Sequence, residues 1–312
     1  MRIVRFQGGL GNQLFQLAFF RMLECMYPER KIKADLSAYW HTTFHQGYEL
    51  ERIFDIRLPQ ATRGEIARYS PYRTLPERLP MEVHRAWQRI LKYKSISYPK
   101  EYFSEPMDSM EESDYFIESL WKNEASVMYL DGFWVWMMRE KYKVHDKEIV
   151  SSWENRLRRD LIFPEYVGEK HAQLIERMKA VPSISVHIRR GDYIGTIFDA
   201  CDEGYYIGAM EYILQQLSGE EEMFVFSDDI EAARSILQKV QIPMHFIEGN
   251  YGNRTFEDMY LMSQCKHHII ANSTFSYWGA HLSAYDGITV APKEYYRNTL
   301  GFSLYDDGWN LI

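Results

Sequence analysis

The C-terminal half of the chain alternates short apolar segments with longer amphipathic ones, and this alternation constrains the fold more than any other feature. Five apolar segments have the length of buried strands: 184–188, 223–227, 244–247, 267–271 and 288–291. The stretches between them have helical spacing, over about 203–217, 229–240, 255–266 and 275–285. Strands that alternate with helices in this way predict a doubly wound parallel sheet covered by helices.

A shorter pattern of the same kind begins the chain. Residues 2–6 are expected to form a buried strand, which a glycine-containing loop joins to a helix starting near Asn12. A helix-rich stretch over about 146–180 is expected to connect this part to the C-terminal one. We therefore predict an α/β protein with two Rossmann-like domains, 1–165 and 166–312, that face each other across a cleft.

Composition argues against several classes of protein. The chain has 312 residues, with 36 Lys and Arg against 44 Asp and Glu, and its net charge of −8 argues against nucleic-acid binding. Its three cysteines are far apart, which favours a reducing compartment without a disulfide framework or structural zinc site. No apolar run approaches the ~18 residues of a membrane span, and no signal peptide is recognisable, so we expect a cytoplasmic protein.

Two adjacent arginines follow the first strand of the C-terminal domain. The segment reads His187-Ile188-Arg189-Arg190-Gly191-Asp192-Tyr193 and begins where the strand opens into a loop. Open α/β sheets bind ligands at this edge, and a planar guanidinium group matches phosphate oxygens. We predict a clamp for a pyrophosphate, with a surface ion pair as the alternative. Residues 190–192 also spell Arg-Gly-Asp, but an adhesion motif belongs on an exposed loop tip.

Another strand of this domain ends in a segment rich in hydroxyl groups. Asn272-Ser273-Thr274-Phe275-Ser276 opens a helix, where hydroxyls, unpaired N–H groups and the helix dipole form an anion site. Ser273 and Thr274 are therefore expected to face the same diphosphate as the arginines. A helix cap alone would also explain these residues.

A third polar segment, Ser227-Asp228-Asp229, leaves two interpretations open. A carboxylate there could accept hydrogen bonds from a guanine edge, or the pair of acids could bind a divalent metal on a diphosphate. The arginines favour the first interpretation, because they already supply the positive charge that a metal would bring. Asp229 also has the place of a helix cap.

The glycine loop of the N-terminal domain is close to a dinucleotide-binding fingerprint without matching it. In Gly9-Leu10-Gly11-Asn12-Gln13-Leu14 a leucine occupies the place of the third glycine, although an acidic residue, Asp35, follows about 20 positions later. A nicotinamide enzyme is therefore disfavoured. The loop offers close approach to the backbone at Gly9 and Gly11, with Asn12 at the helix start, where an asparagine can act as a cap.

Together and in this order, these motifs resemble the α-1,2-fucosyltransferases of glycosyltransferase family 11. The resemblance spans nearly the whole chain. The matching segments are 8–16, 48–50, 130–134, 187–193, 205–206, 226–229 and 272–280. The resemblance implies a GT-B fold and a metal-independent enzyme. That enzyme would transfer L-fucose from GDP-β-L-fucose, with inversion, to the 2-hydroxyl of a terminal β-galactoside.

The same resemblance implies roles for individual residues. Arg189 and Arg190 would neutralise the departing β-phosphate, Asp228 would lie near the guanine, and Asn12 would project toward the reacting sugar. Preorganised donors of this kind contribute ~3–4 kcal/mol each to transition-state stabilisation. The predicted catalytic residues are Arg189, Arg190 and Asn12. The predicted donor-binding residues are Gly9, Gly11, His187, Arg189, Arg190, Asp192, Ser227, Asp228, Asn272, Ser273, Thr274 and Phe275, with no metal ligand and no cofactor besides the GDP-sugar.

The sequence does not identify the group that takes the proton from the acceptor hydroxyl. The alternatives are Asp35, Glu49, Asp131, Asp192, or late proton loss to the leaving phosphate. Two other functions also fit the motifs. One is a GDP-sugar-dependent transferase with a different linkage or acceptor, and the other is a non-catalytic protein that binds a sugar or nucleotide.

The segment 57–100 is strongly basic. It carries ten Lys or Arg and three Glu residues, with tyrosines and a tryptophan interleaved. Such a segment could dock weakly to an anionic membrane, at about 1 kcal/mol per basic residue near the surface. A solvated loop is the favoured interpretation of this segment, and weak peripheral contact of a cytoplasmic protein with the inner membrane is the alternative.

Overall fold

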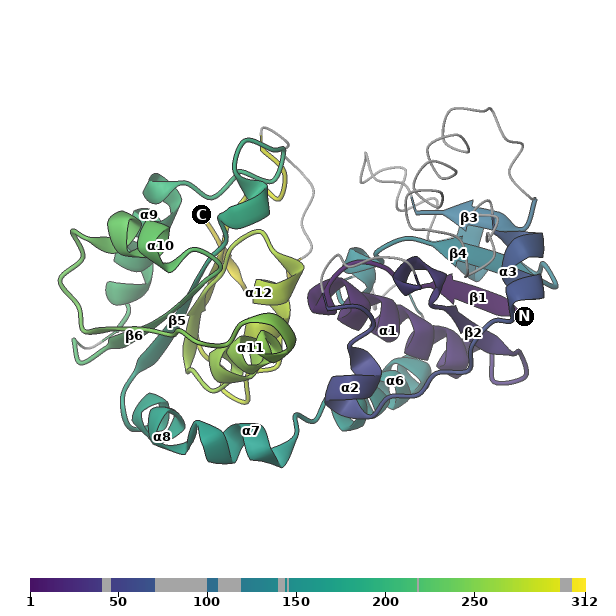
Figure 1. The fold of residues 1–312 in the computed structure, drawn as a ribbon, viewed down its shortest axis with the longest axis horizontal. Coiled ribbons are helices and arrows are strands. Elements are labelled where there is room, and N and C mark those ends of the chain that lie inside the picture. The colour runs from purple at the N-terminus through teal and green to yellow at the C-terminus, as the bar shows by residue number, and fades with distance from the viewer. Residues whose placement is uncertain are drawn as a thin grey trace. The chain divides into compact units, whose positions relative to one another are not determined.

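The structure, a computed structural model, describes residues 1–40, 46–70, 100–105, 119–139, 144, 146–217, 219–297 and 305–312. The chain divides into two compact units, Met1–Ile162 and Phe163–Ile312, and each contains one parallel sheet with helices packed on it (Figure 1). The α/β prediction is confirmed for both units. The acceptor-side and donor-side roles assigned to the two halves stay predictions.

The sheet of the first unit is parallel throughout and has the order β2-β1-β4-β3. Its strands are β1 Arg2–Arg5, β2 Ile32–Asp35, β3 Tyr102–Ser104 and β4 Met128–Asp131. Val4 of β1 pairs with Ala34 on one side and Leu130 on the other. Because all four strands are parallel, their carboxyl ends meet at one edge of the sheet, and open α/β sheets bind ligands outside that edge.

Helix α1, Leu10–Met26, connects β1 to β2 and is buried along most of its length. Helix α6, Lys147–Asp160, packs against it. The fully buried Trp153 of α6 donates its Nε1–H to the carbonyl of Ala18 at 2.7 Å, which ties the two helices together. The other helices of the unit are the 3-10 helices η1 Ser37–Tyr39 and η2 Val135–Met137 and the α-helices α2 Leu50–Phe54 and α3 Arg63–Tyr69.

The sheet of the second unit is also parallel, with the order β10-β9-β8-β5-β6-β7. Its strands are β5 Ser183–Ile188, β6 Glu222–Ser227, β7 Met244–Phe246, β8 His267–Ile269, β9 Thr289–Ala291 and β10 Asn310–Leu311. All five predicted strands are present, and β10 adds a sixth at one edge. This is the strand order of a doubly wound nucleotide-binding fold, whose switch point lies between β5 and β8.

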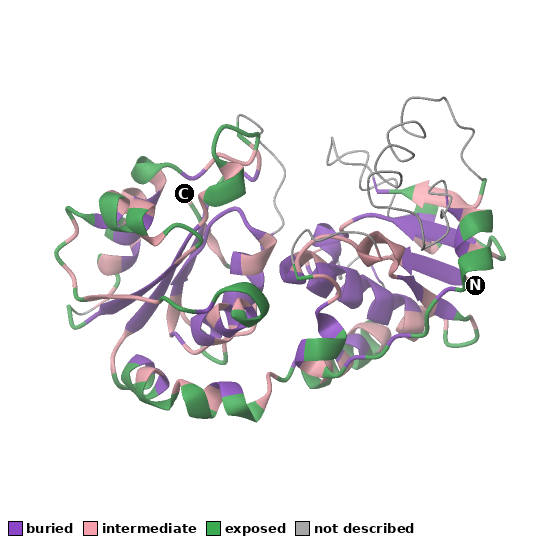
Figure 2. Cartoon of the chain, viewed as in Figure 1, coloured by how far each residue is buried: buried purple, intermediate pink, exposed green. Residues whose placement is uncertain are grey.

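Helices cover both faces of this second sheet because its central strands are buried on both sides. Ile184 and Val186 of β5 join an apolar cluster with α9, whereas His187, pointing to the opposite face, contacts α12. Figure 2 shows buried strands in both units and helices with exposed outer faces. The helices of this unit are α7 Glu165–Lys170, α8 Ala172–Ala180, η4 Gly191–Tyr193, α9 Glu203–Leu214, α10 Ile230–Leu237, η5 Gly252–Arg254, α11 Phe256–Ser263 and α12 Thr274–His281.

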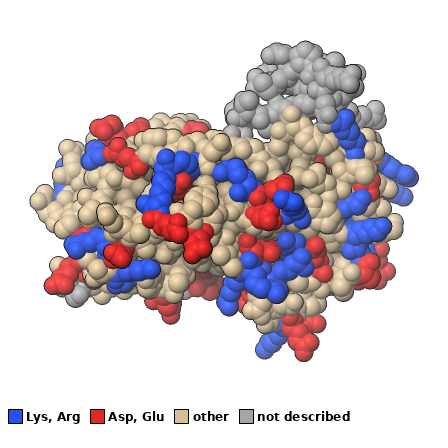
Figure 3. All heavy atoms as spheres, turned by 60° about the horizontal axis from the view of Figure 1, so that its bottom comes forward, with Lys and Arg blue, Asp and Glu red and all other residues tan. Residues whose placement is uncertain are grey.

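The described surface carries both signs of charge. On the face drawn in Figure 3, basic and acidic side chains are intermixed. No helix in the described ranges combines the length and the apolarity that crossing a membrane requires. The membrane contact predicted for 57–100 falls mostly on 71–99, which lie outside the described residues, and it stays a prediction.

Candidate active site

The two arginines of the predicted clamp lie at the switch point of the second sheet. Arg189 and Arg190 follow β5 directly. Val186 of β5 pairs with Ile269 of β8, so Arg189 and Asn272 each lie three residues beyond a paired position, at the carboxyl edge. The clamp and the segment that opens α12 therefore share the place where a doubly wound sheet binds its ligand.

Asp228 organises the arginine loop. It follows β6, the neighbour of β5, and its Oδ1 accepts the backbone N–H of Arg190 at 2.8 Å. Its Oδ2 is 3.3 Å from Nη1 of Arg189, and Asp192 accepts a hydrogen bond from Nη2 of the same guanidinium at 2.6 Å. A Cβ at Gly191 would lie 2.4 Å from Oδ2 of Asp228, so this close approach requires glycine. Two carboxylates thus hold the Arg189 fork in one orientation.

Both guanidinium groups keep donors for a ligand. Their side chains are 28% and 24% exposed, for Arg189 and Arg190 respectively. Arg189 lies over the ring of Tyr193 at 5.3 Å, and Nη1 of Arg190 is 3.7 Å from Oδ1 of Asp199. In the described part of the chain, Nε of each arginine is buried without a hydrogen-bond partner. Because an unpaired buried donor is costly, the loop is suited to receive an anion.

The start of α12 adds donors at the same edge. Ser273 caps the helix by accepting the N–H of Phe275 at 3.3 Å, and Thr274 is the first helical residue. The first turn of a helix presents N–H groups and the positive end of the dipole, which favour a phosphate. The cap and the anion site predicted here are compatible in one structure.

Asn272 is buried and linked within the protein. Its amide donates to the carbonyls of Phe198 and Tyr295, at 2.9 and 2.6 Å, and the thiol of Cys201 donates to its Oδ1 at 3.4 Å. These bonds hold two loops of the second unit against the end of β8. A direct contact between the Asn272 side chain and the donor stays a prediction.

His187 is buried and neutral. Its Nδ1 shares a hydrogen bond with Oγ of Ser276, which links β5 to α12, and its ring lies 5.8 Å from that of Phe275. Burial, together with the charge of Arg189, lowers the pKa of His187 to about 3. The imidazole is therefore uncharged at neutral pH and connects the strand to the helix; the contact predicted between His187 and the donor stays a prediction.

The two acids after β6 have different partners. Asp229 caps α10 by accepting the N–H of Ala232 at 3.0 Å, so the cap interpretation is confirmed. Oγ of Ser227 accepts the N–H of Asp229 at 3.0 Å, whereas Asp228 holds the arginine loop. Within the described ranges, no three His, Cys, Asp or Glu side chains gather as metal ligands. The contact between Asp228 and a guanine stays a prediction.

The glycine loop of the first unit has a left-handed turn at Gly8, with φ of 81°. A Cβ there would lie 2.5 Å from Nδ2 of Asn12, so glycine is required. Gly9 occupies the N-cap of α1, Gly11 is buried in the first turn, and Asn12 is the third helical residue. The expectation that Asn12 acts as the cap is therefore wrong. Gln13 secures the loop by donating to the carbonyl of Gly8 at 3.0 Å.

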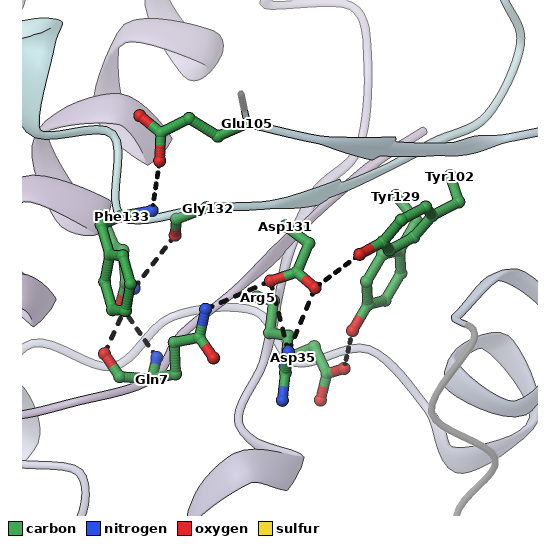
Figure 4. Close-up of polar contacts among 10 residues, drawn as sticks. Arg5, Gln7, Asp35, Tyr102, Glu105, Tyr129, Asp131, Gly132 and Phe133 are labelled. Carbon is green, nitrogen blue, oxygen red and sulfur yellow. Dashed lines mark hydrogen bonds and ion pairs between the residues drawn. The ribbon is translucent and has the colours of Figure 1, made fainter. Parts of the chain in front are cut away.

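The four carboxylates considered as bases are all engaged with other groups. Asp35, Glu49 and Asp131 are buried, and Asp192 is exposed. Burial raises the pKa of Glu49, against the effect of Arg52. Asp35 accepts hydrogen bonds from Tyr129 and from the backbone of Ser37, and Asp131 accepts them from Arg5, Gln7 and Tyr102 (Figure 4). Glu49 pairs with Arg52, and Asp192 pairs with Arg189. Geometry therefore singles out none of the four as the base.

Glu105 is a buried carboxyl that the sequence analysis missed. It follows β3 and accepts the backbone N–H of Phe133 at 2.6 Å (Figure 4). It also accepts the backbone N–H of Trp134, at 3.0 Å. Burial raises the pKa of Glu105 to about 7, and the nearby charge of Asp131 acts in the same direction. Gly132 gives the carboxyl room, because a Cβ there would lie 2.6 Å from it. The only sequence signal was that Glu105 stands next to a three-residue strand.

Asp258 is a second missed carboxyl, in the first turn of α11. Burial raises the pKa of Asp258 to about 7, and Asn250 donates a hydrogen bond to its Oδ1 at 2.7 Å. The Asp258 side chain is half-buried, and a carboxyl whose pKa is raised toward neutral marks a functional-site candidate. In the sequence it was hidden within an otherwise ordinary amphipathic helix.

The family model described as glycosyl transferase family 11 matches residues 112–312, a range that includes the arginine loop and the start of α12. The chain belongs to glycosyltransferase family 11. It is 32% identical to the α-1,2-colitosyltransferase of Escherichia coli, over 95% of this chain and 92% of the relative. It is 28% identical to the O-antigen biosynthesis glycosyltransferase WbnK of the same organism, over 97% of each chain.

Solved structures confirm the fold of this family-11 chain. The crystal structure of the fucosyltransferase NodZ from Bradyrhizobium superposes with a TM-score of 0.51, at 14% identity, over 90% of this chain and 92% of NodZ. With two parallel α/β sheets and this likeness, the GT-B fold prediction is confirmed. The cleft between the two units stays a prediction.

Proposed function

We propose that the protein is an inverting galactoside α-1,2-fucosyltransferase that uses GDP-β-L-fucose and needs no metal ion. The observation that carries this proposal is the arginine loop at the β5/β8 switch point, beside the N-terminus of α12. Two guanidinium groups and a helix start form a site for a diphosphate. Family 11 consists of glycosyltransferases, so the group that the chain transfers is a sugar.

The geometry supports a single displacement. The acceptor hydroxyl attacks the anomeric carbon of the donor while the bond from that carbon to the β-phosphate oxygen breaks. Negative charge then collects on the departing GDP, where Arg189, Arg190 and the first turn of α12 are already in place. Donors that need no rearrangement at that moment stabilise a transition state more than mobile ones do. The acceptor proton leaves late, to the phosphate, or to one of the four carboxylates.

Two relatives support the linkage. The E. coli relative is named for α-1,2 transfer of colitose, and 113 residues of the chain are 27% identical to the mouse galactoside 2-α-L-fucosyltransferase Sec1, over 35% of this chain and 30% of Sec1. The first of these names also favours one alternative, namely a colitosyl donor in place of the fucosyl donor. The two donors should therefore be compared directly.

Transfer from GDP-fucose to a terminal β-galactoside is expected to survive excess EDTA, because the two guanidinium groups and the α12 dipole neutralise the leaving GDP. GDP release and product NMR measure this, and the expected product has the α-1,2 linkage. Activity that EDTA abolishes and Mg²⁺ or Mn²⁺ restores would overturn the metal-independent mechanism. A colitosyl donor run in parallel decides between the two sugars.

The Asn12→Asp variant is expected to lose at least tenfold in kcat and to stay as stable as the wild type. An acid in the first turn of α1 favours the helix dipole, so the free energy of unfolding does not fall. The added negative charge would instead repel the phosphates of the donor, and about 1.4 kcal/mol in the transition state is tenfold in rate. Steady-state kinetics and thermal unfolding measure both effects. Full activity in both Asn12→Asp and Asn12→Ala would remove Asn12 from the site.

A further inference from the structure

The carboxyl edge of the first sheet holds a mixed polar cluster where β1 and β4 end side by side. Arg5 ends β1, Asp131 ends β4, and Gln7 follows β1 by two residues (Figure 4). Tyr102 of β3 contributes its hydroxyl group. All four residues belong to the first unit, whereas the arginine loop belongs to the second. The carboxyl ends of parallel strands are the edge outside which open α/β sheets bind ligands.

Asp131 has no acceptor site left for a ligand. Its Oδ1 accepts from Nε2 of Gln7 at 3.2 Å and from Nη1 of Arg5 at 3.3 Å. Its Oδ2 accepts from the same Nη1 at 3.1 Å and from the hydroxyl of Tyr102 at 2.9 Å. A carboxylate offers about four lone-pair sites, and here all are occupied. Asp131 is therefore an anchor for its neighbours.

That anchor fixes the orientation of the Gln7 amide. A carboxylate only accepts hydrogen bonds, so the group that faces Asp131 must be the Nε2 donor, and Oε1 must point the other way. Figure 4 shows this arrangement. The Gln7 backbone is also held, because its N–H donates to Oε1 of Gln16 at 3.0 Å and its carbonyl accepts from Nε2 of Gln16 at 3.2 Å.

The carbonyl oxygen of the Gln7 side chain is left available. Gln7 is half-buried, and among the described residues none donates a hydrogen bond to its Oε1. The positive charge of Arg5 is offset by Asp131 at 3.1 Å. The cluster thus presents an uncharged, rigidly oriented hydrogen-bond acceptor, which matches a hydroxyl group better than it matches a phosphate.

We propose that Oε1 of Gln7 accepts a hydrogen bond from a hydroxyl group of the acceptor sugar, with Asp131 and Arg5 as positioning residues that fix the amide. This inference rests on the proposed function, in which the donor phosphates are bound by the other unit. The amide orients the hydroxyl and takes no proton from it. A site built to bond a hydroxyl discriminates strongly against sugars that lack it, because the polar group is then left unpaired.

The test is the Gln7→Met variant, which keeps the length of the side chain and removes the carbonyl. Loss of one neutral hydrogen bond is expected to raise KM for the galactoside about tenfold, while KM for the donor and the affinity for GDP stay unchanged. Gln60→Met is the matched control, because Gln60 is exposed in the same unit. An unchanged acceptor KM in Gln7→Met, or a change confined to the donor KM, would overturn the proposal.

A double-mutant cycle tests the positioning role of Asp131. Asp131→Asn, whose amide can flip, is expected to raise the acceptor KM in the wild-type background and to add little in the Gln7→Met background. If the two substitutions raise the acceptor KM additively, Asp131 acts independently of Gln7 and does not position its amide. Should Asp131→Asn unfold, Tyr102→Phe removes one of the hydrogen bonds to Asp131 and takes its place in the cycle.

Binding separates this inference from the proposed function. Saturation-transfer NMR with methyl β-galactoside in the presence of GDP measures acceptor affinity without turnover. A wild type that transfers no fucose overturns the proposed function, yet weaker galactoside binding by Gln7→Met would still support the role of Gln7. If the wild type and Gln7→Met bind the galactoside equally, or if the wild type does not bind it, the role proposed for Gln7 is contradicted.

Discussion

Arg189→Lys is expected to lower kcat by roughly 10²-fold or more while the protein stays folded. In the structure, Nη2 of Arg189 is held by Asp192 at 2.6 Å and Nη1 lies 3.3 Å from Asp228, so the fork has one fixed direction. Lysine keeps the charge but presents a single rotating ammonium group, which cannot reproduce the two-pronged contact with a phosphate. Turnover at saturating GDP-fucose measures the loss.

A matched substitution isolates the effect of geometry. Arg234 lies in the same unit and pairs with Glu248 at 2.7 Å on the surface, so Arg234→Lys is expected to leave kcat unchanged. The kcat of Arg190→Lys is expected to lie between those of the other two variants. The guanidinium of Arg190 is 3.7 Å from its nearest carboxylate, so its direction is fixed less firmly than that of Arg189. Near-normal turnover in a folded Arg189→Lys enzyme would remove the clamp from the mechanism.

Glu105 is expected to make the first unit less stable as pH rises from about 5 to 8. Burial raises the pKa of Glu105 to about 7 in the folded protein, from an ordinary value near 4.5. Between these values the folded state keeps a proton that the unfolded chain has released, so the free energy of unfolding falls with rising pH. The shift corresponds to about 3 kcal/mol across the window.

Urea unfolding of Glu105→Gln at pH 5 and pH 8 measures this contribution. The variant cannot titrate, so its free energy of unfolding relative to the wild type should rise by up to about 3 kcal/mol between the two pH values. Glu65→Gln is the control, because Lys33 lowers the pKa of Glu65 and the stability that it contributes is lost only in acid. Parallel curves for the wild type and Glu105→Gln would refute the prediction.

The second unit was predictable because its pattern is local. Its central strands are buried on both faces: β6 contains a continuous apolar run, and β5 alternates apolar residues with Ser185 and His187, which are small or hydrogen-bonded inside the unit. The arginine loop and the start of α12 follow strand ends directly, and parallel strands bring those ends to one edge. The sequence could not show which acid orients the arginines. Asp228 is 38 residues away from Arg190 in the sequence, and the pairing of β5 with β6 brings the two together.

The first unit was harder because its sheet depends on distant segments. β3 and β4 have three and four residues, too few for a periodic signal, and they lie in a region of irregular composition. The cluster around Asp131 therefore could not be assembled from the sequence. The wrong prediction of Asn12 as the helix cap also has a physical reason. The N-cap of α1 is Gly9, which has no side chain to mark it in the sequence, and the helix begins at Leu10, two residues before Asn12.

The position of β1 has a consequence for biosynthesis. This strand is made before the other three strands of its sheet, yet it lies in the interior of the sheet, and its partner β4 ends only at Asp131. At ~5–20 residues per second, a ribosome takes on the order of ten seconds to make the intervening chain. During that time one edge of β1 keeps its backbone N–H and C=O groups unpaired, and such an edge can pair with other chains. The sheet of the first unit can therefore close only after β4 has been made and pairs with β1.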